Sequence, residues 1–183
     1  MDTITDSRSE IPLAECAAAT VTPLVPVTRF SLRAKVTARG ALAEALGAEL
    51  PGRVGQCAGA GDVRILCLGP DEWLIQAPGG DSTQIEEACA DVYANAPHAL
   101  TDVTDREVSF GITGPKAAEL LTLGCPRDID ALPVGEARRT VFDGATVMLW
   151  RDEETAFRLD AWRSFAPHVA ALLVTGAGEL AAE

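Results

Sequence analysis

The segment Leu68–Ile75, which reads Leu-Gly-Pro-Asp-Glu-Trp-Leu-Ile, constrains the fold of this chain more than any other. Gly69 and Pro70 are typical of a tight turn, because Gly tolerates positive φ and Pro fixes φ. From Trp73 onward, large apolar side chains recur with the period of two that marks a β-strand. The segment therefore predicts a strand end, a turn and a new strand, with a buried indole directly after two acidic residues.

Few large side chains are available for a core, because aromatic residues make up only 5% of the 183 residues. The length fits one domain, or two small lobes that share a core. Ala, Leu and Val must supply most of the buried surface. We therefore expect Trp73, Trp150 and Trp162 to be core residues whose loss is strongly destabilising.

The net charge of −12 argues against nucleic acid as a partner, because phosphates repel an acidic protein that has no basic patch. No apolar run approaches the roughly 20 residues that span a bilayer, so we expect no membrane partner. The N-terminus lacks the basic and apolar regions of a secretory signal. The five scattered cysteines form no C-x-x-C pair. This pattern favours free thiols in the cytoplasm, with no metal site.

Hydrophobic periodicity predicts an α+β fold: antiparallel sheets with helices packed on one face, arranged as two similar small lobes in a single compact unit. Residues 1–25 are expected to form an extended N-terminal arm, because prolines interrupt any regular period there. Residues 26–97 would form the first lobe and residues 98–183 the second. The expected strands are residues 28–37, 63–68, 73–77, 100–103, 107–112, 139–142, 145–150 and 155–162. The expected helices are residues 40–50, 81–95, 115–123 and 164–174.

Three local features refine this prediction for the second lobe. Asp143-Gly144 between two alternating segments is the strongest hairpin signal in the chain. The strands 100–103 and 107–112 are expected to pair with each other across a short acidic turn. Ser164 is expected to cap the last helix.

The polar residues that could bind a ligand follow two predicted strands. Asp102, Asp105 and Arg106 form an acidic turn with a neighbouring guanidinium, which suits either a ligand site or a turn closed by its own ion pair. Arg163 precedes a helix N-terminus and could bind an anion or anchor the cap. These four residues are the candidate cofactor-binding residues.

No residue is predicted to be catalytic. Cys125 follows a helix C-terminus, the wrong end of a helix dipole for lowering the pKa of a thiol. Ser164 does not lie in a G-x-S-x-G motif. Gly59-Ala60-Gly61 precedes a strand, whereas a dinucleotide fingerprint follows a strand and opens a helix.

Five motifs, taken in order and spacing, carry a family resemblance. They are Leu-Gly-Pro-Asp-Glu-Trp (68–73), Asp-Val-Thr-Asp-Arg (102–106), Ile-Thr-Gly-Pro (112–115), Gly-Cys-Pro-Arg-Asp (124–128) and Arg-Ser-Phe-Ala (163–166). Together they resemble the sarcosine oxidase gamma-subunit family, from about residue 28 to residue 175.

The resemblance implies a fold related to the folate-binding domain of aminomethyltransferases. It also implies a non-catalytic gamma subunit that scaffolds the alpha, beta and delta subunits of a heterotetramer, which oxidatively demethylates sarcosine or a related N-methyl amine. FAD, FMN, NAD and tetrahydrofolate would then belong to the partner subunits, with none bound by this chain. Arg138-Arg139-Thr140 departs from the family pattern and marks an altered contact surface.

Two other functions remain open. The chain could be a free-standing folate-binding or aminomethyltransferase-like domain, with Asp102 or Asp105 holding the pterin. It could also be a cytosolic scaffold unrelated to either family. The sequence leaves open which N-methyl amine such a complex would use.

Overall fold

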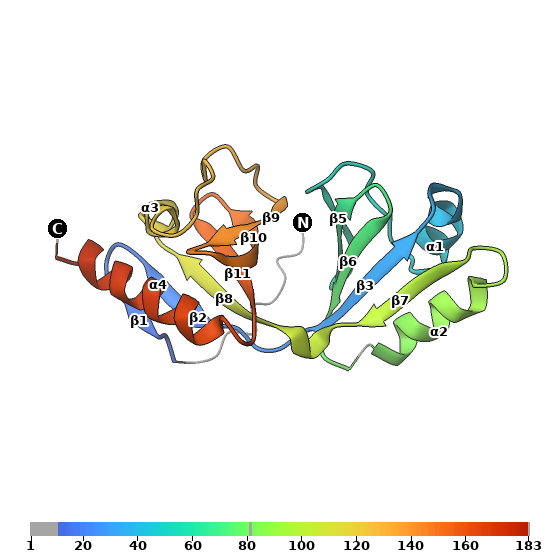
Figure 1. Cartoon of the computed structure of the whole chain (residues 1–183), viewed down its shortest axis with the longest axis horizontal. Coiled ribbons are helices and arrows are strands. Elements are labelled where there is room, and N and C mark those ends of the chain that lie inside the picture. The colour runs from blue at the N-terminus through green and yellow to red at the C-terminus, as the bar shows by residue number, and fades with distance from the viewer. Residues whose placement is uncertain (1–10, 81, 183) are drawn as a thin grey trace. The chain divides into compact units, whose positions relative to one another are not determined.

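The chain divides into two compact units, of which one is a continuous segment and the other is built from two separate segments (Figure 1). The computed structural model describes residues 11–80 and 82–182. One unit is the continuous segment 26–104. The other combines residues 105–183 with the N-terminal segment up to residue 25. Each unit has its own sheet and its own hydrophobic core.

The unit of residues 26–104 contains a five-stranded antiparallel sheet in the order β4-β5-β6-β3-β7. Its strands are β3 (Thr28–Ala34), β4 (Cys57–Ala60), β5 (Val63–Gly69), β6 (Glu72–Ala77) and β7 (His98–Asp102). Its helices are η1 (Val36–Ala38), α1 (Arg39–Ala45) and α2 (Ser82–Val92), and the short η2 (Thr104–Arg106) lies at the boundary of the unit. The predicted strand pair around Gly69 and Pro70 is β5 and β6.

One face of this sheet is buried under α1 and α2. Phe30, Leu32 and Ile75 of the sheet pack in one cluster with Leu42 of α1 and Ile85 of α2. The helices are amphipathic, so each buries its apolar stripe and leaves acidic residues in water. The predicted arrangement of helices on one sheet face is confirmed for this unit.

Trp73 is the largest side chain in this cluster. It is 1% exposed, and its indole N–H donates a hydrogen bond to the carbonyl of Pro51 at 2.8 Å. That bond satisfies the indole inside an apolar core and holds the chain that follows α1.

The second unit contains a six-stranded antiparallel sheet in the order β1-β2-β8-β11-β10-β9. Its strands are β1 (Ala14–Glu15), β2 (Thr20–Pro23), β8 (Glu107–Thr113), β9 (Ala137–Phe142), β10 (Ala145–Glu153) and β11 (Ala156–Trp162). The predicted hairpin joins β9 to β10 through Asp143 and Gly144, which have φ of 45° and 79°. Positive φ at both residues is what a type I′ hairpin turn requires.

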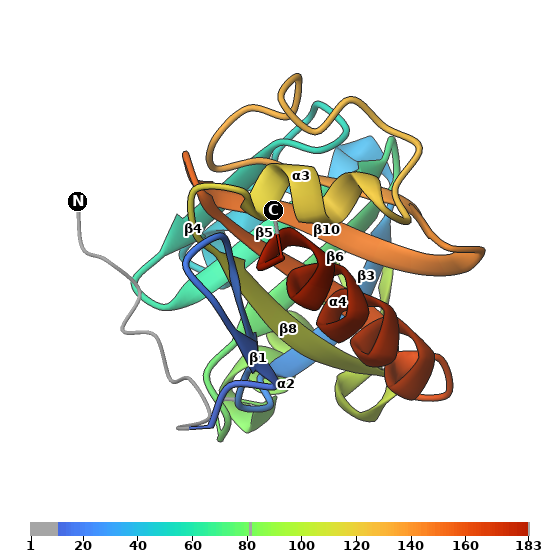
Figure 2. The same ribbon diagram turned by 90° about the vertical axis from the view of Figure 1, so that its left-hand side faces the viewer.

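Figure 2 shows the two helices of this unit, α3 (Ala117–Thr122) and α4 (Ala166–Leu180), in front of its strands. Leu120 and Leu121 of α3, together with Val169 and Leu173 of α4, share one core cluster with the apolar face of the sheet. Gly176 has no side chain, and a Cβ there would lie 2.7 Å from side-chain atoms of Leu120. A small residue in α4 therefore permits the close approach of α3.

The N-terminal segment differs from the expected arm. Residues 1–10 lie outside the described residues, but β2 pairs with β8 and places Ala19 and Val21 in the core, at 1% and 0% exposure. The prolines did not prevent a strand, because Pro23 lies at its last residue. Residues 11–25 are therefore part of a folded sheet.

The expected lobe boundary at residues 97 and 98 also differs from the structure. The strand His98–Asp102 was expected to pair with residues 107–112. It pairs instead with β3, in the unit of residues 26–104. β8 pairs instead with β2 and β11. The pairing of the strands that flank the acidic turn was thus predicted wrongly, because strand partners can lie far apart in sequence.

Two predictions at the end of β11 were also wrong. Trp162 is 44% exposed and is not a core residue. Phe165 occupies the N-cap position of α4 with no side-chain cap, so Ser164 does not cap the helix. The helix also continues to Leu180, beyond the expected end at residue 174.

We expect the substitution Trp73→Ala to lower the free energy of unfolding by about 3–5 kcal/mol, because it leaves a large cavity and an unbonded carbonyl at Pro51. Trp162→Ala is the matched control, and we expect it to cost only about 1 kcal/mol because that indole is partly in water. Urea denaturation of both variants, followed by far-UV circular dichroism, measures the difference. Equal losses would contradict the assignment of Trp73 as the core anchor.

Candidate functional site

Asp102, the first candidate residue, caps the turn that follows β7. Its carboxylate Oδ1 accepts a hydrogen bond from the backbone N–H of Thr104 at 2.8 Å. The hydroxyl oxygen of Thr104 accepts a hydrogen bond from the backbone N–H of Arg29 at 2.9 Å, and this bond connects the turn to β3. Asp102 thus has a local structural partner within the unit of residues 26–104.

The other three candidates lie in the second unit. The Nε of Arg163 donates to the carbonyl oxygen of Asp105 at 3.0 Å, and its Nη2 lies 3.4 Å from the Asp105 carboxylate. Arg106 pairs with Glu107, with an Nη2 to Oε1 distance of 3.0 Å. The backbone N–H of Arg163 donates to the carbonyl of Arg106 at 2.9 Å, so the ends of β8 and β11 meet here.

These contacts describe turn caps and ion pairs at the surface. The side chain of Asp105 is fully exposed and that of Arg163 is 62% exposed, and exposed pairs contribute only about 0–1 kcal/mol. The structure brings Asp105, Arg106 and Arg163 together. Asp102 belongs to the other unit.

A buried polar cluster in the second unit was missed by sequence reasoning. Asp160 of β11 is 1% exposed and accepts hydrogen bonds from the hydroxyl of Ser109 and from the indole N–H of Trp150, the latter at 2.8 Å. Asp160 lies directly opposite Ser109 in the pairing of β8 with β11. Because this pairing joins residues 51 positions apart, no local sequence pattern predicts it.

A guanidinium extends this cluster across the same sheet. Arg158 stacks over the ring of Trp150, with its Cζ 4.5 Å from the ring centroid, and pairs with Asp152 at 3.2 Å. The stacking and the ion pair together fix the guanidinium plane. Asp160, Trp150 and Arg158 therefore hold one another in place, as expected for a rigid structural element.

Residues 125–128, also singled out in the sequence, hold no activated nucleophile. Cys125 is buried, and its Sγ lies 3.9 Å from the hydroxyl of Thr140. Asp128 accepts hydrogen bonds from the N–H groups of Asp130 and Ala131, at 3.1 and 3.3 Å. This segment is a turn closed by an aspartate.

Neither histidine lies in a metal-binding cluster. Nε2 of His168 lies 2.8 Å from the carboxylate of Asp143, and both side chains are more than half exposed. Across residues 11–80 and 82–182, no group of three or more His, Cys, Asp or Glu residues is placed to hold a metal ion.

The described helices also include none that is long and apolar enough to cross a membrane.

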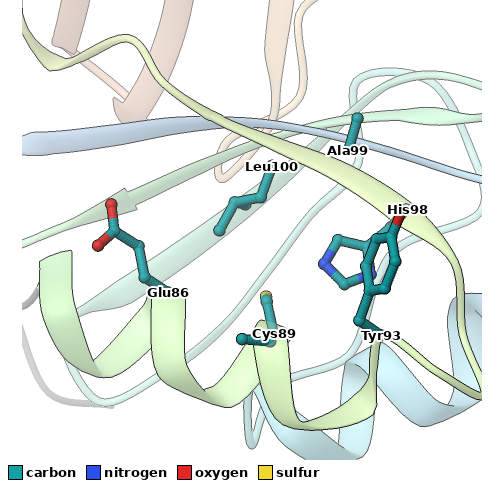
Figure 3. A pocket seen from close by; sticks show the side chains of 7 residues that line it. Glu86, Cys89, Tyr93, His98, Ala99 and Leu100 are labelled. Atoms are coloured by element: carbon teal, nitrogen blue, oxygen red, sulfur yellow. The ribbon is translucent and has the colours of Figure 1, made fainter.

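An open pocket of about 620 Å³ lies between α2 and β7 (Figure 3). Glu86 and Cys89 come from α2, Tyr93 directly follows this helix, and His98 and Leu100 come from β7. Tyr93 and His98 meet edge to face, with ring centroids 5.3 Å apart. The Nδ1 of His98 lies 2.8 Å from the carbonyl oxygen of Ala96 and donates its proton to it, because a carbonyl can only accept.

The thiol that lines this pocket has a raised pKa. Burial raises the pKa of Cys89 from 9.0 to about 11, because the thiolate is poorly solvated there. Burial also raises the pKa of Cys67, although a backbone hydrogen bond at Gly69 and the nearby positive charge of Arg39 oppose that shift. All five cysteines are free. Neither Cys67 nor Cys89 has the lowered pKa of a catalytic nucleophile.

Structural comparison defines the fold class first. The chain is similar to the aminomethyltransferase T of the glycine cleavage system from Bartonella henselae, with a TM-score of 0.64 at 16% identity. That match covers 87% of this chain and 46% of the longer enzyme. The expected α+β, aminomethyltransferase-like fold is thereby confirmed.

Closer relatives define the family. A chain of the heterotetrameric sarcosine oxidase from Corynebacterium sp. U-96 matches with a TM-score of 0.82 at 30% identity, covering 94% of this chain and 90% of that one. The sarcosine oxidase subunit gamma of Corynebacterium sp. (strain P-1) is 34% identical over 78% of this chain and 71% of that protein. The model of the sarcosine oxidase gamma subunit family matches residues 33–179, so the chain belongs to this family.

We expect Asp160→Ala to lower the free energy of unfolding by about 1.5–3 kcal/mol, because Ser109 and Trp150 each lose a buried charged acceptor. Asp105→Ala removes a fully exposed carboxylate and is the control, which should leave the free energy of unfolding nearly unchanged. Thermal and urea unfolding of the two variants give the comparison. A stable Asp160→Ala variant would show that the cluster is dispensable for folding.

Cys89 makes stability depend on pH above neutrality. Its folded-state pKa of about 11 exceeds the ordinary 9.0, so the folded state holds the proton more tightly. The contribution of the protonated thiol is complete below pH 9.0 and is lost as the pH rises towards about 11. Cys89→Ala should therefore flatten the decline of unfolding free energy in this window, measured by urea titrations at several pH values. The exposed-helix substitution Ala171→Ser should leave the slope unchanged.

Proposed function

We propose that this chain is a non-catalytic gamma subunit that scaffolds the alpha, beta and delta subunits of a heterotetrameric flavin-dependent oxidase. The complex would oxidatively demethylate sarcosine or a similar N-methyl amine. The observation that carries the proposal is the likeness, along 94% of this chain, to a chain of a heterotetrameric sarcosine oxidase. The family match over residues 33–179 supports the same assignment.

The polar chemistry of the chain supports a structural role. The candidate residues Asp102, Asp105, Arg106 and Arg163 all engage neighbouring backbone or side-chain groups. A general acid or base would need a perturbed group facing an enclosed site. The thiol in the open pocket at α2, Cys89, has a raised pKa, which is the opposite of an activated nucleophile.

The cofactors of such a complex, FAD, FMN, NAD and tetrahydrofolate, would lie in the partner subunits. In support, Gly59 lies inside β4 and Gly61 forms the turn to β5, with φ of 57°. This glycine-rich segment joins two antiparallel strands. A dinucleotide site needs glycines that lead from a strand into a helix, whose N-terminus then meets the phosphates.

Tetrahydrofolate binding by the lone chain is the second candidate function, favoured by the likeness to aminomethyltransferase T. Asp102 or Asp105 would hold the pterin. Because the matched region is only 46% of that enzyme, we propose that this chain lacks part of a complete folate pocket. The cytoplasm is the proposed location, since all five cysteines are free thiols.

Co-expression of the tagged chain with the genes beside its own, followed by affinity capture, tests the leading proposal. We expect captured partners with the visible absorption bands of bound flavin and with turnover of sarcosine or another N-methyl amine. Substrate specificity follows from comparing sarcosine with N-methylglutamate. Capture of a colourless chain without partners would reject the proposal.

Calorimetric titration of the isolated chain with tetrahydrofolate tests the alternative. The subunit proposal predicts no specific binding, because the exposed Asp105 and the capping Asp102 do not line an enclosed pocket. Specific binding that is abolished by Asp102→Ala or Asp105→Ala, but not by the control Asp130→Ala, would establish a folate site instead.

A further inference from the structure

The outer edge of β7 has unused backbone hydrogen-bonding groups. β7 is the last strand of its sheet, and among the described residues it pairs only with β3. The backbone N–H of Val103 donates a hydrogen bond to the carbonyl oxygen of Arg29 in β3. In an antiparallel pair every second residue bonds to the neighbouring strand, so this bond shows which residues of β7 face β3. Ala99 and Thr101 therefore direct their backbone groups towards β3. The N–H and C=O groups of His98, Leu100 and Asp102 point away from the sheet.

This edge lacks the bulges, prolines and Lys or Arg residues that protect other edges from pairing, although β7 is a short strand of five residues. Natural edge strands are kept short, or carry basic residues, proline or bulges. The opposite edge strand β4 has four residues and includes Gly59, and the edge strand β9 of the other sheet carries Arg138 and Arg139. β7 contains neither glycine, proline nor a basic Lys or Arg residue, and its pairing with β3 is regular.

A pocket lies beside the same edge. Side chains alternate along a strand, so His98 and Leu100 share the face that α2 covers, and both line the pocket with Cys89 and Tyr93 (Figure 3). Tyr93 is 56% exposed, and its ring meets the His98 ring edge to face, so part of the aromatic surface stays open to a partner. A strand added at β7 would place alternate side chains over this pocket.

The surroundings are acidic. Glu86, Glu87 and Asp91 are exposed on α2, and Asp102 is exposed at the end of β7. The segment 82–102 contains no Lys or Arg. An extended segment with basic side chains on either side of one apolar or aromatic side chain would match this charge and this pocket.

We propose that an extended segment of a partner subunit pairs with the outer edge of β7 and inserts an apolar or aromatic side chain into the pocket between α2 and β7. Its flanking Lys or Arg residues face the acidic side of α2. This inference rests on the proposed function, since it names the surface through which the subunit would dock. Backbone pairing would supply affinity and the pocket would supply specificity, as in other cases of strand addition.

Hydrogen–deuterium exchange of the captured complex and of the isolated chain tests the pairing. In the isolated chain, the outward amides of His98, Leu100 and Asp102 should exchange rapidly. In the complex, the peptide spanning residues 98–102 should exchange more slowly. Unchanged exchange in an assembled complex would overturn this inference and leave the proposed function intact.

A pair of matched variants tests the pocket. Ala90→Arg places a long basic side chain at the pocket from an exposed position of α2, and Ala171→Arg makes the same change on an exposed position of α4. Both should melt at the temperature of the unmodified chain. We expect Ala90→Arg alone to weaken partner binding by about tenfold or more.

Three other results would overturn the docking proposal. The first is equal partner recovery by the two variants, and the second is a dimer of the isolated chain in which β7 is already protected, which would make a second copy the occupant. The third is an unmodified chain that captures no flavin-bearing partner, which would reject the proposed function together with this surface.

Discussion

Each unit of this protein depends on covering one face of an antiparallel sheet with two helices, using very few aromatic side chains. Four of the five phenylalanines are buried, and Trp73 and Trp150 are each 1% exposed. Leu, Ile, Val and Ala fill the remaining volume. Because a core of small side chains must be closely packed to gain enough apolar burial, helices and strands approach closely at small residues such as Gly176.

The polar residues of the chain are used to hold this framework together. Asp160 accepts from Ser109 and Trp150, and Arg151 is 8% exposed and donates to the carbonyl groups of Asp130 and Leu132. Buried charges are costly unless they are paired in this way. Because these buried polar groups form hydrogen bonds within the chain, they hold its turns and strands in place. A chain of this kind is suited to present a fixed surface to other subunits. That character agrees with membership of the sarcosine oxidase gamma subunit family.

Much of the local structure was predictable because the signals are local. The hairpin at Asp143 and Gly144 formed where it was predicted, and the tight turn between β5 and β6 formed at Pro70 and Asp71, one residue later than predicted. Trp162 was misassigned from its residue type alone, because the alternation of β11 places it on the face opposite the core residues Leu159 and Ala161. The candidate residues Asp102 and Asp105 were identifiable as a turn, but their partners Thr104 and Arg163 depend on the folded chain.

The helices, the tight turns and the α+β class could be predicted from the sequence, since these depend on residue types that are close together in the chain. The pairing of β7 with β3, the pairing of β2 with β8, and the burial of Asp160 against Ser109 became known only from the folded chain. They could not be predicted because backbone hydrogen bonds are the same for every strand. The choice of partner is therefore set by which apolar faces can be buried together across the whole unit.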